Sequence, residues 1–217
     1  MIRHHPSLDL LADYASGALP EPLALLIACH ASLCAECRGQ LAALDKLGGA
    51  ILDELSPAPL GDDALEDALR RIDRSAPAPL PEAAAALDAR SRAILPAPLR
   101  RYLPQGMGAL RWRWRGPLRE ARFDLPSRGF RVSLFRLKAG AAAPRHGHAG
   151  HEFTLVLEGG FRDAGRQYNR GDFALADSSR AHVQIADEEG CLCLVVLDAP
   201  VRLSGVLGAI ANRFLRF

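Results

Sequence analysis

The sequence lacks the features of a membrane or exported protein. No stretch of its 217 residues approaches the 18 consecutive apolar residues that suggest a membrane-spanning helix. No cationic leader followed by an apolar segment opens the chain, so we expect no export and a cytoplasmic location. In that compartment, we expect its five cysteines to be reduced, metal-bound or buried rather than paired in disulfides.

The chain also lacks a strong charge of either sign. Its formal net charge is only +2, which gives no electrostatic footprint for DNA or RNA. The Arg-Trp alternation at 111–115 fits a strand with one solvent-facing side better than a platform for stacking bases. We therefore expect neither direct nucleic-acid binding nor membrane binding.

Potential metal ligands are concentrated near the start of the chain. His30, Cys34 and Cys37 have the spacing His-x3-Cys-x2-Cys. A Cys-x2-Cys pair offers two thiolates to one ion, and a histidine four residues before it lies one helical turn away on the same face. Thiolates beside an imidazole suit tetrahedral zinc. A fourth ligand is available from His4 or His5, and spacing alone does not decide between them.

The first half of the chain shows helical periodicity and the second half shows strand alternation. We predict four helices in the first half, the first capped by Ser7. The fourth follows a break at Pro57 and Pro59, and its single apolar stripe either folds back on the other helices or binds a partner.

Composition also suggests where the domains divide. The Ala- and Pro-rich stretch at 76–81 has the composition of a semi-rigid spacer. The predicted units are a zinc-binding helical domain at 1–80, a Pro-rich linker with a short helix at 81–108, a β domain at 109–205 and a tail at 206–217.

The second half carries the most specific pattern in the chain, formed by Gly140, His146, His148, Glu152 and Gly159. Residues two apart on a strand share a face, so His146 and His148 project the same way, and Glu152 has the same parity. We expect a hairpin turn at Gly159–Gly160 and a fourth ligand, His182, delivered by a later antiparallel strand.

Three further cysteines and one further histidine are predicted to have roles other than metal binding. We interpret Cys29 as a buried apolar residue, with a role as a competing ligand or reactive thiol as the alternative. Cys191 and Cys193 share a strand face at the full extended repeat, which disfavours a disulfide between them and predicts two core residues. His151 points away from Glu152 and is expected to face solvent or to support the ligands from outside.

These motifs resemble those of a known family. The pattern from Gly140 to Gly159 resembles the first cupin motif in full, and the region from Gly171 to His182 resembles the second motif loosely, without its usual Pro-x-Gly. The N-terminal His-x3-Cys-x2-Cys, with a histidine near the chain start, is similar to the zinc-containing anti-sigma domain. Over nearly the whole chain, the combination resembles the ChrR-type anti-sigma factors.

The resemblance implies an α+β multidomain fold, with an N-terminal zinc-binding four-helix domain followed by an all-β cupin (double-stranded β-helix) barrel. It implies that the helical domain sequesters a sigma factor of the extracytoplasmic-function (ECF) type. It also implies that the cupin is needed for the response to singlet oxygen or organic hydroperoxides. The implied ligand sets are His5, His30, Cys34 and Cys37 for a first zinc, and His146, His148, Glu152 and His182 for a second metal, zinc or else iron or manganese.

The main alternative is a cupin enzyme, because three histidines and a glutamate also form the metal site of cupin dioxygenases and isomerases. A separate helical metal domain has no evident place in a small dioxygenase. The second half also offers no further Asp, Lys or Tyr whose position marks it as a general base. We therefore predict a regulator rather than an enzyme, with an inert structural metalloprotein as a third possibility.

Overall fold

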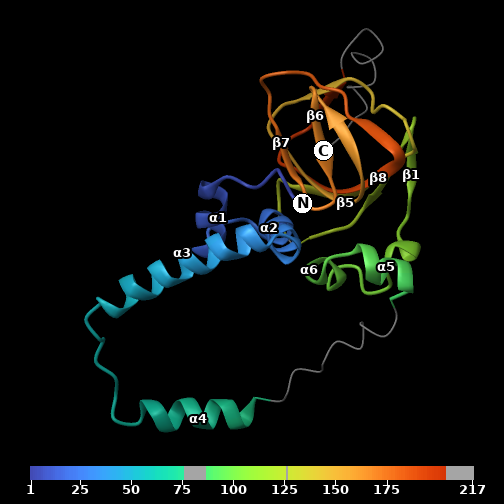
Figure 1. Ribbon diagram of the computed structural model, residues 1–217. Coiled ribbons are helices and arrows are strands. Elements are labelled where there is room, and N and C mark those ends of the chain that lie inside the picture. Colours follow the sequence, from blue (N-terminus) through green and yellow to red (C-terminus); the bar gives the residue numbers. More distant parts are fainter. Residues whose placement is uncertain (76–86, 126, 204–217) are drawn as a thin grey trace.

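The structure is a computed structural model that describes residues 1–75, 87–125 and 127–203. Its first part is helical and its second part is built of strands (Figure 1). The helices are α1 (Leu8–Ala15), α2 (Glu21–Leu33), α3 (Ala35–Asp53), α4 (Ala64–Arg74), α5 (Ala89–Ile94), α6 (Ala97–Arg100) and the 3-10 helix η2 (Met107–Ala109). In these ranges no helix is long and apolar enough to cross a membrane. The stretch at 76–81 and the predicted tail at 206–217 lie outside the described residues.

Local sequence signals determine where the first helices begin. Ser7 caps α1, because its hydroxyl oxygen accepts a hydrogen bond from the N–H of Leu10 at 3.3 Å. Pro22 lies in the first turn of α2, where its missing N–H costs nothing. Cys34 ends α2 and caps α3, with its sulfur accepting from the N–H of Cys37 at 3.5 Å. The two helices therefore meet at the predicted metal-ligand motif.

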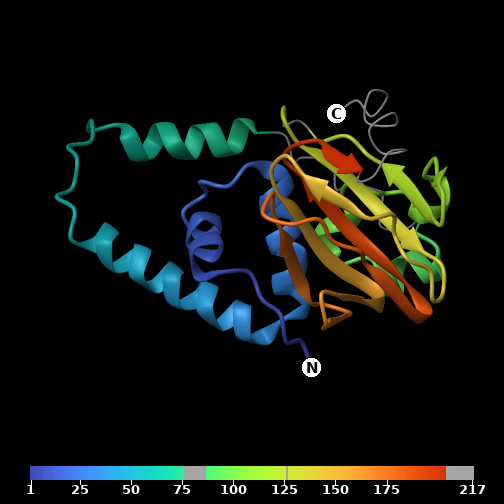
Figure 2. The ribbon, with the colours of Figure 1, turned by 90° about the horizontal axis from the view of Figure 1, so that it is seen from above.

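Helix α4 stands apart from the other helices. None of its residues is buried, and both ribbon views separate it from α1, α2 and the strands (Figures 1 and 2). The C-terminal half of α3 also projects away from the body of the molecule. In this structure, the predicted four-helix domain is three packed helices and a separate fourth, because the apolar stripe of α4 meets no apolar surface.

The strands form two antiparallel sheets, of seven and two strands. They are β1 (Arg113–Arg115), β2 (Leu118–Arg122), β3 (Arg131–Leu137), β4 (His146–His148), β5 (Glu152–Asp163), β6 (Arg166–Asn169), β7 (Phe173–Ala176), β8 (Ile185–Leu197) and β9 (Val201–Leu203). The large sheet has the order β1-β2-β3-β8-β5-β6, with β7 also paired to β5, while β4 pairs with β9. Strand pairing does not close a complete ring among these strands, so the structure supports the α+β class without a closed barrel.

The hairpin turn predicted at Gly159–Gly160 is wrong. Strand β5 continues through both glycines, and its register with β8 shifts there, as at a β-bulge. Gly159 has φ +65°, and a Cβ atom at this position would collide with the carbonyl of Gly190. The glycines therefore permit close packing inside a bent strand, and the chain turns at Ala164–Gly165 instead.

The helices and the large sheet share one hydrophobic core. Leu134 and Leu194 on one sheet face pack in the same cluster as Leu26 of α2 and Leu99 of α6. The opposite face carries a second cluster that includes Val156 and lies inside the β structure. The α2 side of the sheet is thus covered by helices, which fixes the helical part against the strands.

The residues predicted to form a linker at 81–108 are packed from Leu87 onward. Leu95, Leu99 and Leu103 are almost fully buried and belong to the shared core. Burying a large aliphatic side chain contributes roughly 1.5–3 kcal/mol, so this segment stabilises the contact between helices and sheet. A spacer description does not fit residues 87–108, and the domain boundaries themselves remain a prediction.

Candidate metal centres

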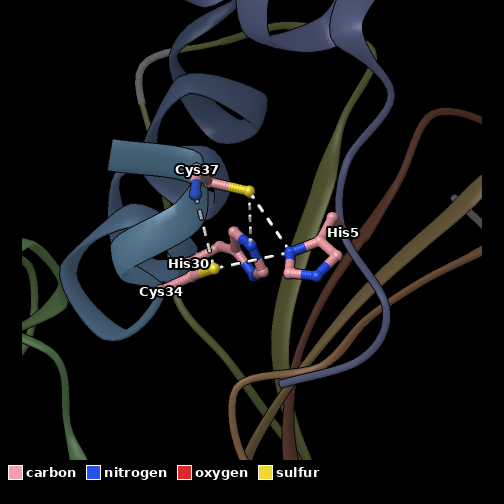
Figure 3. Close-up of side chains that lie close together, drawn as sticks. All are labelled: His5, His30, Cys34 and Cys37. Carbon is pink, nitrogen blue, oxygen red and sulfur yellow. Dashed lines mark hydrogen bonds between the residues drawn. The ribbon is translucent and has the colours of Figure 1, made fainter. Parts of the chain in front are cut away.

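The first candidate centre lies where three N-terminal segments meet (Figure 3). His5 comes from the segment before α1, His30 from the last turn of α2, Cys34 from the junction and Cys37 from the first turn of α3. One potential ligand atom of each residue lies within 4.8 Å of the others. The structure therefore brings together all four residues of the first predicted ligand set.

The spacing of these atoms fits a tetrahedral ion. His5 Nδ1 lies 3.4 Å from both the Cys34 and Cys37 sulfurs, and His30 Nε2 lies 3.2 Å from the Cys37 sulfur. Ligands on one tetrahedral zinc are about 3.3–3.8 Å apart, given the usual Zn–S and Zn–N bond lengths. His30, Cys34 and Cys37 are buried, and two sulfurs with two imidazoles are a donor set that zinc prefers. The residues present therefore fit zinc.

Both imidazoles of this centre have a polar partner at their other ring nitrogen. His30 Nδ1 donates to the carbonyl oxygen of Gly171 at 2.9 Å, which leaves Nε2 to face the sulfurs. His5 Nε2 lies 3.5 Å from a carboxylate oxygen of Glu36 on α3. Such outer partners fix the ring orientation and tautomer of metal-binding histidines.

Burial favours the neutral forms of His30 and Cys37 in the absence of an ion. Burial lowers the pKa of His30 to about 4, against the opposing hydrogen bond to Gly171, so the ring is neutral near pH 7. Burial raises the pKa of the Cys37 thiol to about 12, and the neighbouring Cys34 sulfur adds to the rise. A thiol of this kind keeps its proton until a metal ion replaces it.

His5, not His4, belongs to this group. His4 turns the other way, donating through Nε2 to the carbonyl of Gln167 at 3.0 Å and packing at a tilt against the ring of Tyr168. Cys29 is fully buried but is not a member of the group, and burial raises its thiol pKa to about 12. The interpretation of Cys29 as a core residue agrees with this position.

The second candidate centre consists of His146, His148, Glu152 and His182, all of them buried. His146 and His148 share a face of β4, as their spacing predicts. Glu152 does not join them by strand parity, because the chain leaves β4 after His148 and Glu152 begins β5. His182 faces His146 across an antiparallel bridge, with both backbone hydrogen bonds formed.

The ligand atoms of this second group converge from three segments. The Nε2 atoms of His148 and His182 are 2.9 Å apart, and Glu152 Oε2 lies 3.7 Å from Nε2 of His146 and 3.9 Å from Nε2 of His148. Burial opposes ionisation of Glu152, but its interactions with the adjacent His146 and with His148 and His182 outweigh burial and lower its pKa to about 2. This ionised carboxylate among imidazoles fits a divalent cation.

Several supporting residues of the second group were not found from the sequence. His182 Nδ1 donates to the carboxylate of Asp163 at 2.7 Å, and His146 Nδ1 donates to the carbonyl of Pro144 at 2.8 Å. Gln184 donates to Glu152 at 2.9 Å. Asp163 is the last residue of β5, beyond the irregularity at Gly159–Gly160, so parity counting could not have placed it beside His182.

Two cavities reach the second group. One of about 340 Å³ is lined by Glu152 and His182 together with polar side chains, including Tyr168 and Arg166. Another of about 360 Å³ reaches His146 and Glu152 from an apolar side that includes Phe135. Small molecules therefore have room beside the ligands.

The remaining cysteines and His151 lie outside both groups. Cys191 and Cys193 are buried and free, in the cluster on the inner sheet face. His151 is half exposed and pairs with Asp198, with His151 Nδ1 at 2.7 Å from the carboxylate. These positions agree with the core and solvent-facing interpretations.

Comparison with known proteins gives a consistent result. A family model for the ChrR cupin-like domain matches residues 122–200. The anti-sigma-E factor ChrR of Cereibacter sphaeroides is 38% identical over 218 residues, which covers 99% of each chain. A chain in the crystal structure of Rhodobacter sphaeroides SigE in complex with the anti-sigma ChrR matches with a TM-score of 0.77 and 35% identity, over 91% of this chain and 100% of that chain. The similarity therefore extends over the helical and the β part alike.

Proposed function

The chain belongs to the ChrR family of anti-sigma factors, and from this premise we propose that it sequesters an ECF-type sigma factor. It releases the sigma factor when singlet oxygen or an organic hydroperoxide acts at the cupin metal centre. The protein is a regulator and not an enzyme, as the anti-sigma factor to which it is 38% identical indicates. A cytoplasmic location follows from this role, because a sigma factor works on RNA polymerase there.

The observation that carries the proposal is an uncovered apolar surface on α3 and α4, here called the α3–α4 face. Its members are Leu47 and Ile51 of α3, Leu55 just after that helix, and Leu65, Leu69 and Ile72 of α4, each more than half exposed. Within each helix they recur at intervals of three or four residues, so they form stripes. Contiguous apolar surface of this kind marks a binding site, and amphipathic helices commonly bind in apolar grooves of a partner.

A sigma factor is the partner that accounts for this face. The solved ChrR complex contains SigE, and 91% of this chain aligns with the matched chain of that complex. The face is formed by the two helices that project from the body, so a partner can reach both sides of them (Figure 2). We therefore assign sigma binding to the helical region within 1–80.

The two metal centres take different roles in this account. His5, His30, Cys34 and Cys37 would hold a zinc ion, whose binding would supply folding free energy to α1–α3. His146, His148, Glu152 and His182 hold zinc, iron or manganese with room for an additional ligand beside it. The β region within 109–205 is thus assigned to sensing.

A substitution on the α3–α4 face tests the proposal. Leu69→Asp in the full chain places a charge where the partner buries an apolar side chain, so affinity for the sigma factor should fall by 100-fold or more. Arg70→Ala is the matched control, because Arg70 is half exposed and its ion pairs among the described residues are with Glu66 and Asp67 on the same helix. Sigma-dependent transcription in vitro, titrated with each variant, gives the measurement. Full inhibition by Leu69→Asp at the wild-type concentration would remove the α3–α4 face from the sigma contact.

A further inference from the structure

The segment before α1 is attached to the β part, although the two are far apart in the sequence. The carboxylate Oδ1 of Asp172 accepts hydrogen bonds from the N–H groups of Arg3 at 2.6 Å and His4 at 3.0 Å. The N–H of Phe173, the first residue of β7, donates to the carbonyl of His4 at 2.9 Å. The next residue is His5, a ligand of the first centre. Its backbone is therefore held by the turn between β6 and β7.

The same turn also holds the second imidazole of that centre. Gly171 accepts the hydrogen bond from His30 Nδ1. Gly171 has φ +91°, and a Cβ atom at this position would press against the side chain of Ile2 at about 2.5 Å, so the turn and the N-terminal segment are in close contact. Two of the four ligands of the first centre thus depend on two adjacent residues of the β part.

Asp172 is built into this turn as a buried carboxylate. It is fully buried, and its Oδ2 atom accepts from the N–H of Asn169 at 2.7 Å. Its hydrogen bonds therefore come from three backbone N–H groups, two of them in the N-terminal segment. Hydrogen bonds to an ionised acceptor are stronger than neutral ones, and they offset the cost of burying the charge.

The turn also connects to the second centre through β6 and β7. Tyr168 of β6 packs at a tilt against the ring of His4, with 4.4 Å between ring centroids, and it lines the 340 Å³ cavity beside His182. Strand β7 pairs Ala176 with the ligand Glu152. A displacement of either strand at the second centre therefore reaches the residues that hold His5 and His30.

We propose that Asp172 is a positioning residue of the first metal centre and that the Gly171–Asp172 turn couples the two centres. The inference rests on the proposed function, because it takes both groups to be metal sites. Asp172 touches no ligand atom of the ion. It fixes the backbone that carries His5, while the adjacent carbonyl of Gly171 fixes the ring of His30. Loss of outer partners typically weakens metal binding by about 10–100-fold.

The test is a cobalt titration of the full chain and its Asp172→Asn variant. The amide keeps the shape of the carboxylate but loses its charge and turns one N–H₂ group toward an N–H donor. Cobalt bound to thiolates gives a charge-transfer absorption, and only the first centre contains cysteine ligands. Competition between this centre and a chelator should show affinity 10–100-fold weaker in Asp172→Asn. Asp124→Asn, which changes an exposed aspartate in the loop after β2, should match the wild type.

A second variant separates positioning from folding. His4→Ala removes the ring that contacts Gln167 and Tyr168 without altering the turn itself, and it should weaken the same absorption-monitored affinity several-fold. Wild-type affinity in Asp172→Asn would overturn the inference. So would an unchanged His4→Ala combined with loss of the second metal in Asp172→Asn, because the turn would then serve only the β fold. Absence of the thiolate band in the wild type would instead contradict the proposed first metal centre.

Discussion

The two candidate metal centres contrast in their donors and in the elements that carry them. The first has two sulfurs and two imidazoles from the N-terminal segment and the α2–α3 junction, a donor set that suits a tetrahedral ion. The second has three imidazoles and a carboxylate, with cavities of about 340 and 360 Å³ bordering its ligands. One centre is suited to holding helices together and the other to admitting a small molecule.

Access alone does not separate the two centres. A hollow of about 420 Å³ borders the first centre at His5 and Cys34, so an oxidant can also approach its thiolates. The two centres differ in how the coordination of a bound metal ion can change. A filled thiolate site responds only by losing a ligand, whereas a His₃Glu site can add one. The predictions below test this contrast.

The largest effect is expected from Cys34→Ser. The sulfur of Cys34 is a ligand atom and also caps α3, so its loss should remove one metal equivalent and much of the helicity of α1–α3. Structural zinc sites contribute about 10–16 kcal/mol in apparent binding free energy, which is more than a domain of this size can lose. Metal analysis, circular dichroism and the transcription assay should all show the change, with inhibition abolished.

Cys29→Ala is the control for that substitution. It removes a buried thiol from the same helix but from outside the ligand group, so metal content and inhibition should stay at wild-type values. If Cys34→Ser also kept its metal and its inhibition, the first centre would not be structural.

An intermediate effect is expected from Asp163→Asn. The carboxylate of Asp163 accepts the hydrogen bond from His182 Nδ1 at 2.7 Å. The amide of asparagine carries no charge, so it should hold the His182 ring in place less firmly. Affinity for the second metal should fall about 10–100-fold, while the thiolate-bound metal is retained. Asp198→Asn, which alters the exposed pair with His151, supplies the comparison. Equal metal affinity in both variants would show that Asp163 does not support the centre.

The smallest effect is expected from Cys193→Ala. Cys193 is a core residue on the inner sheet face and belongs to neither ligand group, so the variant should lose about 1 kcal/mol of unfolding free energy. Its response to oxidant should be unchanged. If the variant lost its response to oxidant, the thiols of the β part would have a signalling role, and the second metal centre would not be the only sensor in that part.

Ligand spacing and residue type, which are local properties, predicted most members of the two groups that the structure brings together. His30, Cys34 and Cys37 lie within eight residues, so one helix junction suffices to bring them together. The choice of His5 over His4 required the family resemblance, and the structure explains it by the contacts of His4 with Gln167 and Tyr168. Parity reasoning reached Glu152 for the wrong reason, since the chain turns between β4 and β5.

Long-range contacts were beyond sequence reasoning. The Pro-rich composition around residue 80 predicted two units joined by a spacer, whereas Leu95 and Leu99 pack between helix and sheet. Asp172 and Gly171 belong to an ordinary turn in the sequence, and only the docking of the N-terminal segment gives them a place beside the first centre. The apolar stripe of the fourth helix predicted either packing on the other helices or binding to a partner, and in this structure no residue of α4 is buried.

The central claim is that the helical part inhibits while the second metal receives the signal. The most direct measurement is sigma-dependent transcription with the full chain, in the presence and absence of a singlet-oxygen source or an organic hydroperoxide, for the wild type and for Ala variants of His146, His148, Glu152 and His182. The account predicts that each variant still inhibits transcription and that oxidant relieves inhibition only in the wild type. Normal relief in all four variants would contradict it and would move the sensor to the thiolates of Cys34 and Cys37.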